Sequence, residues 1–140
     1  MAATRVPKLR PVRSARARGV HAEDVRRLLQ SLPRISQGRV HGHPSFLVNG
    51  EFFARFRDAD TVLVLRLATI DDRDVLMQLD ARVFFYTEHY RNYATVLIRL
   101  SEVSPALLRE VVRESWRHVA GGPQKRTTLR QGRKRGRAAT

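Results

Sequence analysis

The dipeptide Asn49-Gly50 constrains the fold of this chain more than any other feature, because it separates two short segments of β-forming residues, 45–48 and 51–57. A two-residue type I′ turn requires positive φ at both central positions, and Asn followed by Gly adopts it at little cost. The pattern therefore predicts a β-hairpin. A third strand is predicted over 61–67, after a turn at 58–60, and its apolar residues on both faces indicate the centre of an antiparallel sheet.

Helical periodicity occurs first near the start of the domain and again after the third strand. A second helix is expected over 70–79, where Thr69 can cap the first turn and Val75, Leu76 and Leu79 would form the buried face. The first helix is expected over 22–31, and its apolar stripe has the spacing i, i+3, i+4 and i+7: Val25, Leu28, Leu29 and Leu32.

The last helix has the clearest boundaries. Ser104 is a good N-cap, Pro105 suits the first helical position, and Gly121 is expected to end the helix. Two further short strands are predicted at 83–86 and 95–100. The pattern predicts an α+β domain, in which N- and C-terminal helices pack on an antiparallel sheet of about five strands. The buried stripe of the last helix is expected to consist of Leu108, Val112, Ser115, Trp116 and Val119.

The net charge of +14 is unevenly distributed along the 140 residues. Residues 1–19 carry six basic and no acidic side chains, residues 121–140 carry seven and none, and residues 20–120 balance 14 arginines with 13 acids. The chain therefore divides into a near-neutral domain, 20–120, between two basic arms, which contain too few apolar residues to order on their own.

Flexible segments that are basic and free of acids attract polyanions by releasing counterions. We therefore expect the arms to bind nucleic acid, in preference to a membrane surface, since they lack the apolar residues of a membrane anchor. The arm residues expected to contact nucleic acid are Arg10, Arg13, Arg16, Arg18, Lys125, Arg126, Arg133, Lys134, Arg135 and Arg137.

Several other functions are excluded or disfavoured. The absence of cysteine excludes a disulfide framework, a thiol nucleophile and a cysteine-ligated zinc site. No apolar run approaches the length of a membrane span and no secretory signal is present, so a cytoplasmic location is expected. His41 and His43 with His89 could form a metal site, but no carboxylate cluster or HExxH pattern accompanies them. We expect no metal, no cofactor and no catalysis, since no nucleophile elbow or phosphate-binding loop occurs.

Four arginines within the domain could add to nucleic-acid binding. Arg55 and Arg57 alternate on one face of a predicted strand, and Arg66 and Arg99 lie in neighbouring strands. Aligned on one face, they would form a basic stripe suited to phosphate contacts. Alternatively, they face solvent and form ion pairs with Glu51, Asp58 or Asp60.

An aromatic segment extends from Phe84 to Tyr93 between two predicted strands. It could form a recognition loop that stacks on a base or ring. Alternatively, Phe84 or Phe85 fills the core and the tyrosines cover the sheet edge. The segment also supports a second hypothesis for the protein, a small-molecule-binding or protein-interaction domain whose pocket would be formed by His43, Phe46, Tyr86, His89 and Tyr90.

From about residue 25 to residue 120 the chain resembles the MmcQ/YjbR family of small bacterial proteins. The resembling stretches are Leu32-Pro33, GHPSFLVNGEFFAR at 42–55, VLRL at 64–67, FFYTEHY at 84–90, VLIRL at 96–100, and 108–120 with Trp116. The resemblance implies a CyaY-like α+β fold, also described as a double-wing arrangement, and a DNA-binding function. The family usually has Lys where Glu51 stands here, and a different loop at 92–95. The resemblance and the basic arms together predict a non-catalytic protein that binds double-stranded DNA electrostatically, with little sequence preference.

Overall fold

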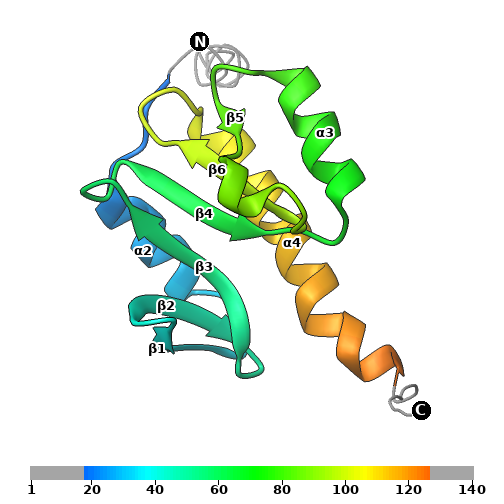
Figure 1. The fold of residues 1–140 in the computed structure, drawn as a ribbon. Coiled ribbons are helices and arrows are strands. Elements are labelled where there is room, and N and C mark those ends of the chain that lie inside the picture. The colour runs from blue at the N-terminus through cyan, green and yellow to red at the C-terminus, as the bar shows by residue number, and fades with distance from the viewer. Residues whose placement is uncertain (1–17, 127–140) are drawn as a thin grey trace, which may run out of the picture.

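The computed structural model describes residues 18–126, with side chains as far as residue 121, so most of both predicted basic arms lies outside the described residues. Six strands form one antiparallel sheet in the order β1-β2-β3-β4-β6-β5 (Figure 1). The elements in chain order are α2 (Ala22–Gln30), β1 (Ile35–Val40), β2 (His43–Val48), β3 (Glu51–Arg57), β4 (Val62–Arg66), α3 (Ile70–Leu79), β5 (Phe84–Phe85), a 3-10 helix (Glu88–Tyr90), β6 (Thr95–Arg99) and α4 (Pro105–Arg126). The α+β class is confirmed.

The predicted hairpin is present, and a second one precedes it. Asn49 and Gly50 have φ values of 53° and 82°, as a type I′ turn requires. His41 and Gly42 have nearly the same values, 52° and 82°, and connect β1 to β2. Strand β1 was not predicted, because His-Gly is a weaker turn signal than Asn-Gly and because the sequence of the strand, ISQGRV, shows no apolar alternation. The sheet therefore has six strands instead of about five.

Helices α2 and α4 cover one face of the sheet, and the main hydrophobic core lies between them and the strands (Figure 1). Val25 and Leu29 of α2 and Val112 of α4 are fully buried there. Ser104 caps α4 as predicted, since its Oγ accepts a hydrogen bond from the Leu107 N–H at 3.2 Å. The predicted end of α4 at Gly121 is wrong, because the helix continues to Arg126. Glycine lowers helix stability by only about 1 kcal/mol relative to alanine and does not by itself end a helix.

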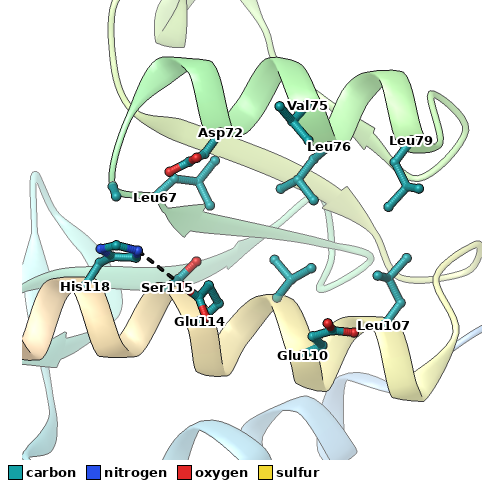
Figure 2. Close-up of a pocket in the computed structure, with 12 residues that line it drawn as sticks. Leu67, Asp72, Val75, Leu76, Leu79, Leu107, Glu110, Glu114, Ser115 and His118 are labelled. Carbon is teal, nitrogen blue, oxygen red and sulfur yellow. Dashed lines mark ion pairs between the residues drawn. The ribbon is translucent and has the colours of Figure 1, made fainter.

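Helix α3 has the predicted boundaries and the predicted cap, with Thr69 Oγ1 accepting from the Asp72 N–H at 3.1 Å. Its predicted buried face is wrong. Val75 and Leu79 are 63% and 62% exposed, Leu76 is half-buried, and the buried residue of the helix is Arg73, 3% exposed. The helix packs against β5 and β6 through the Arg73 side. Leu76 and Leu79 point toward α4 (Figure 2), and Leu76 and Met77 also pack against the main core.

Arg18 holds the start of the domain against two other segments. Its guanidinium Nη1 lies 3.3 Å from Asp80 Oδ2, just after α3, and donates to the Glu102 carbonyl oxygen at 2.8 Å, just before α4. Burial raises the pKa of Asp80, but hydrogen bonds from the Arg82 backbone N–H and from Arg18, with the charges of both arginines, leave that pKa below its ordinary value of 3.8.

We expect Asp80→Asn to destabilise the fold by about 1 kcal/mol or less at neutral pH. Asparagine can still accept from the Arg82 N–H, so the variant removes chiefly the carboxylate charge. A depressed folded-state pKa stabilises the fold above the ordinary value, and this contribution disappears as the pH falls through the lowered pKa. Urea unfolding of both proteins should therefore differ at pH 7 and agree well below pH 3.8. A difference that persists in strong acid would contradict this assignment.

Candidate functional site

The strand registers place the four sheet arginines on one face. Arg55 pairs with Val64 and Arg57 with Val62 across β3 and β4. Val62 pairs in turn with Arg99 across β4 and β6. Residues directly opposite in register project to the same side of a sheet, and alternate residues along a strand share that side. Arg66, two residues after Val64, joins them, so Arg55, Arg57, Arg66 and Arg99 share one face, an arrangement that the sequence analysis considered without predicting it.

We call this surface the outer face, because it lies opposite the face that α2 and α4 cover. Its centre is a small apolar cluster of buried residues, separate from the main core: Val62, Val64 and Leu97. Partly buried aromatic side chains pack against this cluster: Phe52, Phe85 and Tyr90. The outer face therefore combines an aromatic and aliphatic centre with four surrounding guanidinium groups.

Two of the four arginines have acidic partners. Arg66 Nη1 lies 3.2 Å from Glu51 Oε1, and Arg57 Nε lies 3.5 Å from Asp58 Oδ1. Glu51 and Asp58 are two of the three ion-pair partners expected if the arginines face solvent. The third partner, Asp60, pairs instead with Arg26 of α2 at 2.8 Å.

Arg55 and Arg99 form no ion pair with any described residue. Arg55 Nη2 donates to the Tyr90 hydroxyl at 3.3 Å, and the Arg99 guanidinium carbon lies 4.0 Å from the centre of the Phe85 ring. Cation–π contact orients the guanidinium and leaves its charge uncompensated. The four arginines with their two acidic partners therefore keep a net positive charge, which can attract an anion.

Arg73, which the sequence patterns did not single out, organises the aromatic segment from inside. Its Nη1 donates to the carbonyl oxygens of Tyr90 and Tyr93 at 2.9 and 3.1 Å, and its Nη2 to that of Arg91 at 3.1 Å. The guanidinium carbon lies 3.9 Å from the centre of the Tyr86 ring. The sequence feature that could have indicated its role is that Arg73 is the single basic residue of a helix otherwise rich in acidic and apolar residues.

This segment lies beside the outer face. Phe84 fills the main core and Phe85 lies on the outer face, so the prediction that one of them is a core residue is confirmed. His89 and Tyr90 stack edge to face, with ring centres 4.7 Å apart. The hydrogen bond and the charge of Arg91 lower the pKa of Glu88, so this acid remains ionised and paired.

The five residues of the alternative pocket fall in different places. Phe46 packs in the main core, edge to face with Phe56, while Tyr90 packs on the outer face. Tyr86 lies over Arg73, and His43 and His89 are exposed. The structure therefore separates Phe46 from Tyr90 by the thickness of the sheet.

In residues 18–126 no group of three or more His, Cys, Asp or Glu side chains is placed to hold a metal ion. None of the described helices combines the length and apolar character needed to cross a membrane. Of the predicted arm residues, only Arg18 has a described side chain. The others lie outside the residues described with side chains: Arg10, Arg13, Arg16, Lys125, Arg126, Arg133, Lys134, Arg135 and Arg137.

A family model described as YjbR matches residues 30–118, well over half of the chain. The chain belongs to the YjbR family. No curated protein shows significant sequence similarity to this YjbR-family protein. Among solved structures, its fold is similar to that of the Deinococcus radiodurans protein DR2400, with a DUF419 domain, at a TM-score of 0.62 and 18% identity over 86% of this chain and 95% of that one. At that identity the likeness supports the fold alone.

Proposed function

We propose that this YjbR-family protein binds double-stranded DNA without catalysing a reaction on it, through phosphate contacts and with little sequence preference. The observation that carries the proposal is the alignment of Arg55, Arg57, Arg66 and Arg99 on the outer face. Guanidinium groups match phosphate oxygens in geometry as well as charge. The proposal needs no cofactor, metal or membrane.

The spacing of the four arginines suits a row of phosphates. Arg55 and Arg57 stand about 7 Å apart along β3, and neighbouring strands of a sheet are about 4.8 Å apart. Phosphate contacts fix the position of a protein on the duplex but carry no direct sequence information. In this proposal the outer face orients the domain on the DNA backbone, and the basic arms supply most of the affinity.

The test compares two variants of the full chain with equal changes of charge. One carries glutamine at Arg55, Arg57, Arg66 and Arg99. The matched control carries glutamine at four exposed arginines of α2 and α4: Arg27, Arg109, Arg113 and Arg117. DNA affinity is measured for each over a range of salt concentrations.

Each lost phosphate contact should reduce the slope of log affinity against log salt by about 0.9, so the outer-face variant should lose about three to four units of slope. The control variant should lose little, because its arginines project from helices on the other side of the sheet. Equal losses in both variants would show that only total charge matters and would overturn the outer-face assignment.

A further inference from the structure

A groove of about 420 Å³ separates α3 from α4, and its centre is apolar (Figure 2). Val75, Leu76 and Leu79 line it from α3, and Leu107 and Val111 line it from α4. Figure 2 shows Leu79 beside Leu107 at one end and Asp72 near His118 at the other, so the two helices are antiparallel. Val75 and Leu79 are both more than half exposed, and neighbouring apolar side chains exposed to this extent on one helix indicate a contact surface.

The ionisable residues that line the groove are three acids and one histidine. Asp72, Glu110 and Glu114 face it, and no Lys or Arg lines it, although the whole chain contains 27 of them. Glu114 pairs with Arg117 and His118. Asp72 and Glu110 form no ion pair with any residue of the described domain. The groove therefore suits a segment that combines apolar side chains with positive charge.

The chain enters the described domain at one end of this groove. Arg18 contacts Asp80, the residue after α3, and the carbonyl of Glu102, shortly before α4. The Gly19 N–H also donates to the Val103 carbonyl oxygen at 2.8 Å. These contacts place residue 18 at the end where Leu79 and Leu107 face each other. The groove is therefore within reach of the segment that precedes residue 18.

The preceding residues have a matching pattern. Val6, Leu9 and Val12 recur every third residue in the segment RVPKLRPVR, which spans residues 5–13. A polyproline II helix has three residues per turn, so these three side chains would share one face. Pro7 and Pro11 favour that conformation in themselves and in the residues before them.

The lengths agree as well. Val6 and Val12 would be about 19 Å apart in a polyproline II helix. Residues 107 and 118 of α4, which mark the two ends of the groove, are about 16 Å apart along the helix axis. The six-residue step from Val12 to Arg18 can span up to about 20 Å, enough to reach the near end of the groove.

We propose that residues 5–13 dock in the α3–α4 groove of the same chain as an extended segment. Val12 lies near Leu79 and Leu107, Leu9 in the middle, and Val6 toward His118. The basic residues Arg5, Lys8, Arg10 and Arg13 lie along the acidic borders. The segment after residue 126 is a poorer occupant, since its large apolar residues are limited to Leu129 and it follows the far end of α4. The inference goes beyond the DNA-binding proposal and does not depend on it.

The chain has no cysteine, so a single Thr4→Cys substitution gives a unique site for a nitroxide spin label in the full-length protein. Position 4 would lie near the His118 end, 14 residues from Arg18. With methyl-labelled protein and no DNA present, the label should broaden the methyl signals of Val111, Leu76 and Leu67 by several fold. Those of Val25 and Leu29 in α2 should stay sharp.

Adding Val6→Ser, Leu9→Ser and Val12→Ser should remove this broadening. A matched control with Ala2→Ser, Ala3→Ser and Ala15→Ser should retain it. Val75→Ser with Leu79→Ser, two exposed positions whose change leaves the core intact, should also remove it. The proposal would be overturned if the spin label at position 4 broadened no methyl signal more than the others. It would also be overturned if the broadening remained after Val6→Ser, Leu9→Ser and Val12→Ser were added. A further sample mixes molecules that carry only the spin label with molecules that carry only the methyl label. If broadening occurs in this mixture and not within one doubly labelled molecule, the occupant of the groove is a second copy of the chain and the proposal is overturned.

Discussion

Replacing Arg73 with leucine is expected to lower the free energy of unfolding by about 3 kcal/mol, the largest effect we expect from a single substitution outside the apolar core. Leucine fills part of the volume but donates no hydrogen bond. The carbonyl oxygens of Tyr90, Arg91 and Tyr93 would lose the donors that now lie within 3.1 Å. An unpaired buried polar group costs about 1–3 kcal/mol, and the loop can turn some of these carbonyls toward water.

Two further variants separate this role from a general effect of charge. Arg73→Lys keeps the charge but lacks the planar fork that reaches three carbonyls, so an intermediate loss is expected. Arg109→Ala removes an exposed arginine of α4 and should change stability by less than about 0.5 kcal/mol. Urea unfolding, followed by far-UV circular dichroism, measures all three. A loss below 1 kcal/mol in Arg73→Leu would mean that the aromatic segment holds its conformation without this side chain.

DNA affinity is expected to fall about 10³-fold or more when the salt concentration rises from about 50 to about 200 mM, if six or more phosphate contacts form. The two arms together carry 13 basic and no acidic residues, so most of these contacts should come from them. Glutamine at Arg133, Lys134, Arg135 and Arg137 should reduce the salt slope by about three to four units.

Substitution is preferable to deletion of residues 121–140, because α4 continues to Arg126 and a cut at 121 would remove part of that helix. The C-terminal positions are also preferable to Arg10 and Arg13, whose charges the groove would partly neutralise if residues 5–13 dock there. Fluorescence anisotropy of a labelled duplex over a salt series gives both the affinity and the slope. An affinity that is independent of salt would exclude an electrostatic mode of binding.

Local sequence patterns were sufficient to predict most of the secondary structure. Asn49-Gly50 formed the expected type I′ turn, and the caps Thr69 and Ser104 begin α3 and α4 as predicted. These features depend on a few adjacent residues, whose backbone preferences act over short range. Strand β1 was missed because His41-Gly42 is a weak example of the same signal.

The candidate site was predicted only in part. Strand alternation placed Arg55 and Arg57 on one face, but their alignment with Arg66 and Arg99 stayed one of two alternatives until the strand registers were known. Their partners required tertiary structure, since Arg26 of α2 pairs with Asp60, and Tyr90 reaches Arg55 on the outer face from the segment between β5 and β6. The pocket hypothesis joined Phe46 with Tyr90 because sequence order alone does not show which face of the sheet each side chain occupies.

The sequence by itself determined the antiparallel hairpin, the helix starts, the family and the division of charge between arms and domain, because each depends on local composition or spacing. Only the tertiary structure decided which side of α3 is buried. Helical periodicity favours burying Val75 and Leu79, yet the helix buries Arg73, whose guanidinium finds three carbonyl oxygens and an aromatic ring in one loop. Those acceptors come from residues 17 to 20 positions away, so no local pattern could reveal them, and the apolar residues they displace form one wall of the groove.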